Sequence, residues 1–526
     1  MSTASKTLQS HVAGGWVAGS GKPVSLVDPT TEAPLAEAST EGVDMGKALD
    51  FARDVGGPAL RAMSFKERGA VLRKLARAIH AHRDELMVLG TQNAGNTRGD
   101  AKFDIDGASG TLAAYADLAD ELGDGKLLVD GEPINIGRSS KLAGQHVWTS
   151  RHGVAVHVNA FNFPAWGIAE KAAVALLAGV PVITKPATST ALLAHRMFEL
   201  FVAEDLLPRG VLSLLCGSTG DLIERLREQD VLAFTGSGDT GTLLRSLKNV
   251  VGHSVRVNVE ADSLNAAILG ADAQPGSETF DLFVKDVVRD VQQKSGQKCT
   301  AIRRVFVHRD RLDAVREVLV ERLRDLKVGN PAHEEVMVGP VATRKQRDDV
   351  LAGIERLVKG GARVATGGKR PEALVGVEGA KGFFVAPTLL ETAGVDAVAD
   401  VHQHEVFGPC TTLLPYDDTA AMIAAIRRGG GGLVASVYSD DKAFVKDVVL
   451  GIASAHGRIV IGNDKVAGSA LPPGTVLPNL VHGGPGRAGG GEELGGARGM
   501  QLYMQRTALQ GYGPLLASLV ADGKKI

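Results

Sequence analysis

Cysteine is scarce in this chain, with three residues among 526: Cys216, Cys299 and Cys410. An odd number without metal-type spacing does not fit a disulfide framework or a zinc site, and we expect no bound metal. A reducing cytoplasm suits such a protein best. Each cysteine is by default a small buried apolar residue, so a further observation must single out any one of them as reactive.

An excess of charge and a long apolar run are lacking as well. The formal net charge is -2 with both signs interspersed, which leaves no basic field for nucleic acid and no polybasic tail for a membrane surface. The longest apolar stretch, residues 172–183, falls short of the roughly 18 residues of a membrane span, and residues 1–16 do not resemble a signal peptide. We expect a cytoplasmic protein that acts on small molecules, without nucleic-acid or membrane partners.

The chain has the composition of a folded protein and a length that predicts more than one domain. Hydrophobic residues make up 44% of it and charged residues 22%. Short β-branched runs alternate with helical patterns at 167–177 and 192–203, which predicts parallel strands joined by crossover helices. The expected fold is α/β with a doubly wound sheet, and its strands are residues 154–158, 180–184, 211–215, 231–235 and 255–259.

A second α/β array is predicted from about residue 261. It has a strand at 304–308 and helices at 281–291, 311–326 and 343–358. Residues 127–147 alternate as a hairpin does, and they could form an arm that pairs with another subunit. Residues 483–499 are so rich in glycine that we expect a loop, either a flexible surface crossing or a functional segment.

Polar residues follow the predicted strands of the first array. Ligands bind beyond the carboxyl ends of strands in open α/β sheets, so these residues should meet at one site. Gly236-Ser-Gly-Asp-Thr-Gly241 also matches the G-x-G-x-x-G pattern between a strand and a helix, although a lone match is weak support. The residues at the strand ends are Asn162, Lys185, Gly217, Gly236 with Ser237, and Glu260.

Cys299 lies between the helix that ends near Val291 and the strand from Arg304. Lys298 and free backbone N–H groups nearby could favour its thiolate. On this pattern alone an inert buried cysteine is the favoured alternative. None of the histidines has a spacing that suggests a metal site or a catalytic triad.

Five short motifs then give Cys299 a context, and they occur in a family's order. Residues 296–299, G-Q-K-C, resemble the G-Q-x-C signature of the aldehyde dehydrogenase superfamily, and the likeness runs from about residue 10 to the end of the chain. The others resemble that family's W-N-F-P, K-P-A, F-T-G-S and E-x-F-G-P elements: FNFP at 161–164, KPA at 185–187, FTGS at 234–237 and EVFGP at 405–409.

The resemblance implies an aldehyde dehydrogenase-like fold, with two doubly wound α/β domains and a small β oligomerisation arm. It implies residues 1–126 and 152–260 as the cofactor-binding domain, 261–470 as the catalytic domain, and 127–151 with 471–526 as the arm and C-terminal segment. Family members are at least dimers, so a homodimer or higher homo-oligomer is expected.

The resemblance also assigns roles to single residues. Cys299 would be the nucleophile, Glu260 the general base, and the Asn162 side chain with the Cys299 N–H the oxyanion hole. Cys216 and Cys410 would be structural. The cofactor-binding residues would be Lys185 and Glu405 at the riboses, Phe407 at the nicotinamide ribose, and Ser237 with the glycine motif Gly236 to Gly241 at the pyrophosphate.

These residue types suit aldehyde oxidation. A thiolate adds to the aldehyde carbon, and an amide donor stabilises the oxyanion. Loss of hydride to the nicotinamide leaves a thioester, which a carboxylate-activated water hydrolyses. We expect partial burial to help Glu260 accept a proton by raising its pKa.

The cofactor expected is NADP rather than NAD. Thr188 stands where many NAD-dependent members have a glutamate that binds the adenosine ribose, and a glutamate there would repel a 2′-phosphate. NAD remains a less favoured alternative.

The C-terminal part, residues 482–507, is similar to the dehydrogenase portion of ring-opening enzymes of phenylacetate and benzoate degradation, the PaaZ/PaaN-like branch. Those enzymes oxidise semialdehydes linked to coenzyme A, which implies that kind of aldehyde here. Three alternatives stay open: a CoA-acylating dehydrogenase, a cysteine hydrolase or thioesterase without redox chemistry, and a structural or binding role with an idle site.

Overall fold

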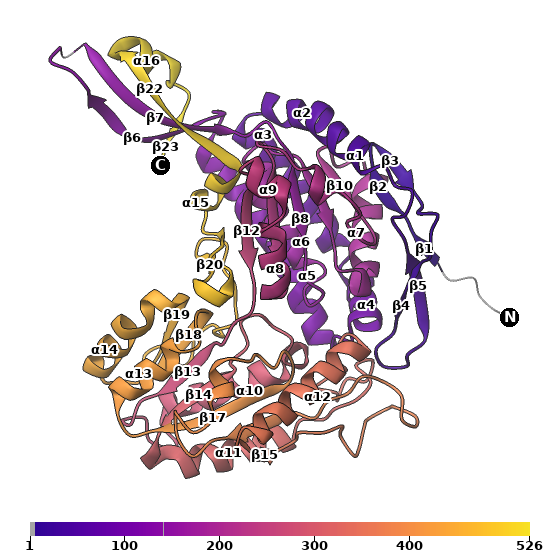
Figure 1. Ribbon diagram of the computed structural model, residues 1–526, viewed down its shortest axis with the longest axis vertical. Coiled ribbons are helices and arrows are strands. Elements are labelled where there is room, and N and C mark those ends of the chain that lie inside the picture. Colours follow the sequence, from indigo (N-terminus) through magenta and orange to yellow (C-terminus); the bar gives the residue numbers. More distant parts are fainter. Residues whose placement is uncertain (1–5, 140) are drawn as a thin grey trace.

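The computed structural model describes residues 6–139 and 141–526. It has a sheet domain built mainly from the first half of the chain, a second sheet domain below it, and a narrow β arm (Figure 1). Residues 1–5 and 140, which fall within the predicted cofactor-binding domain and arm, lie outside the described residues. No helix in the described part is long and apolar enough to cross a membrane.

The first sheet has seven strands in the order β12-β11-β8-β9-β10-β2-β3. The first five strands in this order are parallel, and they confirm the predicted strands to within two residues. Their bounds are β8 (Ala155–Val158), β9 (Val182–Lys185), β10 (Leu212–Leu214), β11 (Val231–Thr235) and β12 (Arg256–Glu260). An antiparallel hairpin of β2 (Ser10–Val12) and β3 (Gly15–Val17) completes one edge.

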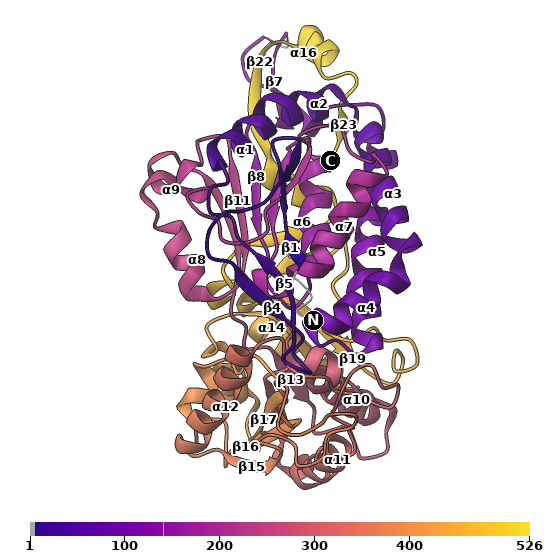
Figure 2. The same ribbon diagram turned by 90° about the vertical axis from the view of Figure 1, so that its right-hand side faces the viewer.

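Helices cover both faces of this sheet, as Figure 2 shows. On one face lie α1 (Met45–Phe51), α8 (Gly238–Arg245) and α9 (Lys248–Gly252). The other face carries α3 (Phe65–Ala81), α4 (Arg83–Ala94), α5 (Arg98–Leu122), α6 (Trp166–Leu177) and α7 (Ala191–Ala203). Helix α6 is almost wholly apolar and is buried on nearly all sides, as expected for a helix enclosed by its neighbours.

The second sheet also has seven strands, in the order β15-β16-β17-β14-β13-β18-β19. All but the antiparallel edge strand β15 (Arg363–Thr366) are parallel. They are β13 (Ala266–Leu269), β14 (Arg304–His308), β16 (Thr388–Glu391), β17 (Cys410–Tyr416), β18 (Gly432–Tyr438) and β19 (His456–Gly462). This confirms the second α/β array and its predicted strand at 304–308.

Two apolar clusters fill the faces of the second sheet. One contains α10 (Glu278–Gln292) and α11 (Leu312–Arg324). The other contains α12 (Arg344–Lys359), α13 (Thr419–Arg427) and α14 (Lys442–Ile452). A smaller sheet of β1 (Lys6–Leu8), β4 (Val24–Val27) and β5 (Pro34–Ala38) flanks the first domain.

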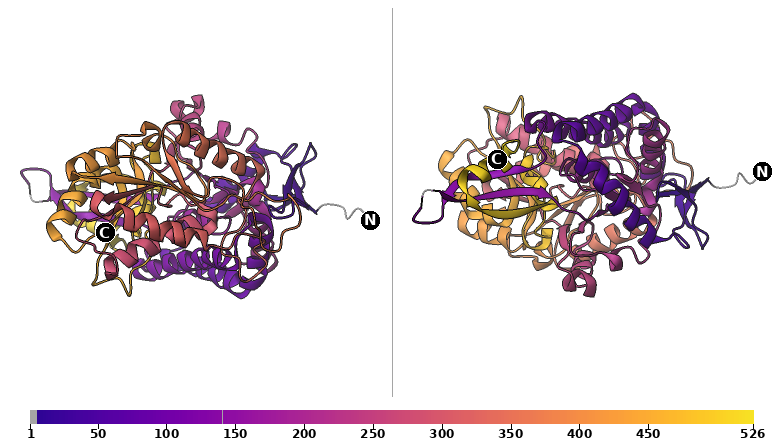
Figure 3. Two further views of the ribbon diagram at one scale, coloured as in Figure 1. Left: turned by 90° about the horizontal axis from the view of Figure 1, so that it is seen from below. Right: turned by 90° about the horizontal axis from the view of Figure 1, so that it is seen from above.

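The predicted hairpin forms the arm. Strands β6 (Leu128–Asn135) and β7 (Leu142–Ser150) pair antiparallel, and β22 (Met504–Tyr512) and β23 (Lys524–Lys525) add to their two edges. The arm projects on the side opposite the β1-β5-β4 sheet (Figure 3). It exposes apolar side chains on β6, β7, β22 and α16 (Gly513–Leu519): Ile134, Leu142, Tyr512, Leu515 and Leu519.

The glycine-rich segment is only partly a loop, so that expectation is wrong in part. Strand β20 (Val481–Gly483) pairs with β21 (Glu492–Leu494), and the short helix α15 (Ala497–Met500) follows. Two N–H···O bonds tie the segment to the carboxyl end of β12: Gly491 N–H donates to the Val259 carbonyl, and Ala261 N–H donates to the Ala488 carbonyl. A flexible surface crossing is thereby excluded.

Candidate active site

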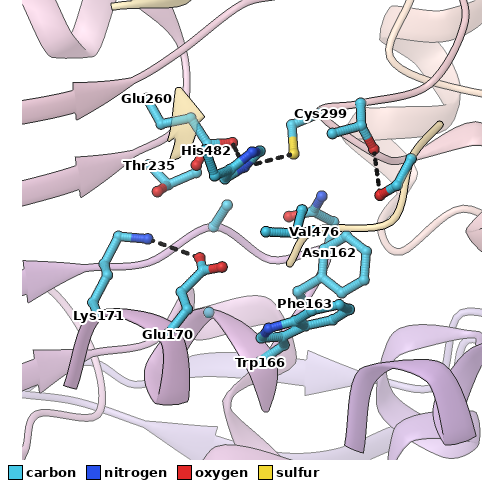
Figure 4. Close-up of a pocket in the computed structure, with 14 residues that line it drawn as sticks. Asn162, Phe163, Trp166, Glu170, Lys171, Thr235, Glu260, Cys299, Val476 and His482 are labelled. Atoms are coloured by element: carbon cyan, nitrogen blue, oxygen red, sulfur yellow. Dashed lines mark hydrogen bonds and ion pairs between the residues drawn. The ribbon is translucent and has the colours of Figure 1, made fainter. Parts of the chain in front are cut away.

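Two pockets meet at Cys299 and Glu260. One reaches toward α6 and residues 474–482, and its lining is drawn in Figure 4. The other reaches toward the N-terminus of α8 and contains Ser237, Glu405 and Phe407. Both share the same central wall, so a molecule in either pocket can reach the Cys299 thiol. The residues common to both are Ala160, Asn162, Thr235, Glu260 and Cys299.

A strained turn after α10 presents Cys299. Lys294 and Ser295 have φ of 53° each, and Gly296 follows with φ of 66°. Such angles are costly for residues with a side chain and persist only where the surroundings enforce them. Here Gly296 packs so closely on the Gly408 carbonyl that a Cβ would lie 2.1 Å from its oxygen. The turn is therefore held in place from the E-x-F-G-P segment, far along the chain.

The predicted oxyanion donors lie together. The Asn162 side chain, which is 8% exposed, donates one amide hydrogen to the Gln297 carbonyl at 3.0 Å. Its NH₂ group has a second hydrogen. The Cys299 carbonyl is held by Asn265 Nδ2 at 2.8 Å, while the Cys299 N–H donates no hydrogen bond within the described residues. One hydrogen of the Asn162 amide and the Cys299 N–H thus have no acceptor within the described residues.

Glu260 ends β12 and is almost fully buried, at 2% exposure. Its Oε1 lies 3.3 Å from Nε2 of His482, and the same nitrogen lies 3.9 Å from Cys299 Sγ (Figure 4). His482 is a site residue that sequence reasoning missed, because it stands 183 positions after Cys299 with no diagnostic spacing. The only hint was its place at the head of the glycine-rich run.

Two electrostatic expectations from the sequence are wrong. Burial alone would raise the pKa of Glu260, but the charge of His482 and then that of Lys171 outweigh it, and the pKa is lowered to about 2. Lys298 does not activate Cys299, because its ammonium is bound to Asp290 Oδ1 at 2.5 Å and to Gln293 at 2.9 Å. Burial and the Glu260 charge instead raise the pKa of the Cys299 thiol, so the thiol needs a base to lose its proton.

A second buried charge cluster adjoins Glu260. Lys171 Nζ lies 3.1 Å from both Glu170 Oε1 and Glu493 Oε2, and carboxylate oxygens of Glu170, Glu260 and Glu493 lie within 4.8 Å of one another. Burial, and then repulsion from Glu170 and Glu260, raise the pKa of Glu493 to about 7, although Lys171 opposes this. Glu493 can therefore gain or lose a proton near neutral pH, next to Glu260.

The second pocket brings together the predicted phosphate-binding residues. Ser237 caps α8, and its Oγ accepts from Thr240 N–H at 3.3 Å. The Gly238 N–H donates to a carboxylate oxygen of Asp262 at 3.2 Å, so the N-terminus of α8 already binds one anionic oxygen. Gly241 lets the helix approach the sheet, since a Cβ there would lie 2.8 Å from Val259 Cγ1. These residues fit a dinucleotide.

The remaining predicted cofactor residues of this pocket are held by protein contacts. Glu405 accepts from Ser263 N–H at 2.9 Å and from Arg303 Nε at 3.2 Å. The Phe407 ring packs edge-on against Phe161, 5.8 Å between centroids. Both residues line the wall of this pocket.

Lys185 and Thr188 lie beside that pocket rather than in its lining, which includes their neighbour Ala187. Lys185 ends β9 and is partly buried, and burial lowers its pKa. The Thr188 hydroxyl donates to the Gly217 carbonyl at 3.2 Å. Thr188 would have to rotate this hydroxyl in order to donate to a phosphate.

Comparisons with known proteins agree with this geometry. A model of the aldehyde dehydrogenase family matches residues 16–508. The chain is 45% identical to 3,4-dehydroadipyl-CoA semialdehyde dehydrogenase of Aromatoleum evansii over 91% of this chain and 93% of that protein.

Solved structures agree as well. The lactaldehyde dehydrogenase of Escherichia coli superposes with a TM-score of 0.84 at 25% identity, covering 97% of this chain and 100% of that one. The betaine aldehyde dehydrogenase of Staphylococcus aureus in complex with NAD+ gives the same score and identity, with 96% and 95% covered. The chain therefore belongs to the aldehyde dehydrogenase family and is an oxidoreductase that acts on an aldehyde with a nicotinamide cofactor.

Proposed function

We propose that the protein oxidises a CoA-linked semialdehyde, of the 3,4-dehydroadipyl-CoA type, to its carboxylic acid with NADP. The observation that carries the chemistry is the meeting of Cys299, Asn162 and Glu260 at the junction of the two pockets. The similarity to the Aromatoleum evansii enzyme supports the substrate class.

The residues of the junction divide the work. Glu260 accepts the thiol proton, and Cys299 Sγ adds to the aldehyde carbon. The Asn162 amide and the Cys299 N–H stabilise the oxyanion, which lowers the barrier to the addition. A nicotinamide cofactor held in the second pocket would supply the acceptor for the hydride that leaves this carbon. The aldehyde carbon is then a thioester on Cys299.

Hydrolysis completes the reaction. A water molecule attacks the thioester carbon and gives a proton to Glu260, and the acid leaves with Cys299 restored. Glu493 supports this step, because its pKa of about 7 lets it take up and pass on the proton that Glu260 must shed. A carboxylate so placed favours water over free coenzyme A as the acceptor, which distinguishes this function from a CoA-acylating one.

The cofactor and the assembly follow from other residues. Thr188 leaves the edge of the nucleotide pocket without the glutamate that would repel a 2′-phosphate, which supports NADP over NAD. The exposed apolar side chains of the arm support its use in a homodimer or higher homo-oligomer. Three free thiols support a reducing cytoplasm as the compartment.

The test is an assay at 340 nm with a CoA-linked semialdehyde, a matched free aldehyde, and NADP or NAD. We expect reduced cofactor to form fastest with the CoA-linked substrate and NADP, and the acid to appear without added coenzyme A. Acid formation that requires free coenzyme A would establish the acylating alternative. No change in absorbance at 340 nm with any aldehyde would favour a cysteine hydrolase.

A further inference from the structure

His482 is the one histidine within reach of both reacting side chains among the described residues. It lies in the middle of β20, opposite Glu493 of β21. The imidazole is 3% exposed, and its Nε2 is 3.3 Å from Glu260 and 3.9 Å from Cys299 Sγ. The mechanism above uses no histidine, so a buried ionisable ring between base and nucleophile needs an explanation.

The charges around the thiol are mostly negative. Glu260 of β12, Glu170 of α6 and Glu405 all act on the thiol through their negative charge, and Glu493 of β21 lies beside Glu260 and Glu170. The cations that face this group are Lys171, which pairs with two of the carboxylates, and Arg458 of β19, whose guanidinium is bound to backbone carbonyls. The negative charge that Glu260 and Cys299 share in the proton transfer is therefore buried among like charges, which is unfavourable without a further cation.

We propose that His482 acts as an imidazolium that compensates the negative charge shared by Glu260 and Cys299. The proton leaves Cys299 Sγ and binds to a Glu260 oxygen, while His482 keeps its own proton. Before the transfer the three groups are a thiol, a carboxylate and an imidazolium, and after it a thiolate, a carboxylic acid and an imidazolium. With the imidazolium their summed charge is zero in both states, whereas without it the buried site would carry a net charge of -1 in both.

The surroundings keep the imidazole charged. Burial favours neutral His482, but the adjacent Glu260, and after it Glu170, outweigh this and raise its pKa. The two carboxylates therefore favour the imidazolium over the neutral ring. This inference deepens the proposed function, on which it rests, and assigns His482 to the activation of the thiol.

Alkylation of Cys299 by iodoacetamide tests the inference without cofactor or aldehyde. The rate is followed by peptide mass spectrometry from pH 5.5 to 10 in the wild type, His482→Gln and His482→Phe. Gln retains a hydrogen-bond donor without charge, and Phe retains ring volume alone. For both we expect alkylation at pH 7 to slow at least tenfold, the pH curve to move up by about a unit or more, and the difference from the wild type to shrink as the thiol ionises at high pH.

The control is His456→Gln, which removes a buried histidine that is bound to the Ile452 carbonyl. It should leave the curve in place. An unmoved curve in His482→Gln or His482→Phe overturns the inference, and so does equal slowing at every pH, which would indicate altered access only. Because alkylation needs neither aldehyde nor NADP, failure of the 340 nm assay would overturn the proposed function and leave this result standing.

Discussion

The ammonium of Lys298 lies 2.5 Å from Asp290 Oδ1, although Lys298 precedes Cys299 directly in the chain. Both side chains are buried, at 1% and 0% exposure. Asp290 is on α10, and its other oxygen accepts from Ile302 N–H at 3.1 Å. The pair thus ties α10 to the turn that carries the nucleophile, and it belongs to the support of the site rather than to the chemistry.

Replacing this lysine should cost stability and leave the thiol unchanged. Lys298→Met leaves the buried Asp290 carboxylate without its cation, which lowers the free energy of unfolding by about 3–5 kcal/mol. Urea denaturation measures the loss in free energy of unfolding. The control is Lys345→Met, which removes the exposed partner of Asp349 and should cost about 1 kcal/mol or less. A shift in the pH curve of Cys299 alkylation with intact stability would contradict this assignment.

Removing the amide of Asn162 should lower the rate of the chemical step. Loss of one oxyanion donor lowers kcat by a factor of about 10²–10³. We expect that fall in Asn162→Ala with little change in KM, measured by steady-state kinetics at 340 nm. The control Asn159→Ala removes an amide bound to Thr184 Oγ1, outside the pocket linings. Equal kcat in Asn162→Ala and the wild type would remove Asn162 from the oxyanion hole.

A carboxylate at position 188 should reverse the cofactor preference. In Thr188→Glu we expect kcat/KM for NADP to fall and that for NAD to rise, a combined shift of about tenfold or more, because the new charge repels a 2′-phosphate. Thr188→Gln is the control, of similar size without the charge. A wild-type kcat/KM for NAD equal to or above that for NADP would contradict the preference.

Glu493 should make stability depend on pH. Its pKa is raised to about 7 in the folded protein, above the unfolded value, so its stabilising contribution is complete below about pH 4.5 and is lost as the pH rises to about 7. Glu493→Gln mimics the protonated form. Its melting temperature relative to that of the wild type should therefore rise between about pH 4.5 and about pH 7 and should stay higher above pH 7. A difference independent of pH would show that Glu493 has an ordinary pKa.

The strands and the nucleophile turn could be predicted because their signals are local. β14 is specified by residues adjacent in the chain, and the strand ends converge by the rule for parallel sheets. Cys299 was singled out by the family motifs and not by its neighbours in the chain. His482 and Glu493 could not be predicted, since the β20-β21 hairpin brings them to β12 from the far end of the sequence. The pKa of Glu260 was misjudged for the same reason.

The glycine-rich segment shows how composition can mislead. Its glycines are needed for close packing rather than flexibility. A Cβ at Gly489 would lie 2.2 Å from the Val259 carbonyl oxygen, and one at Gly491 would lie 2.5 Å from it. Only glycine allows the backbone to run against β12 at this distance, which is how His482 and Glu493 reach the site.

The most direct test of the account is a comparison of the wild type with Cys299→Ala at 340 nm, using NADP and a CoA-linked semialdehyde. Cys216→Ala is the matched control, since Cys216 is fully buried beside β10. We predict steady formation of NADPH and acid, without added coenzyme A, by the wild type and Cys216→Ala, and none by Cys299→Ala. Turnover that survives in Cys299→Ala, or acid formation without NADPH, would contradict oxidation through a thioester on Cys299.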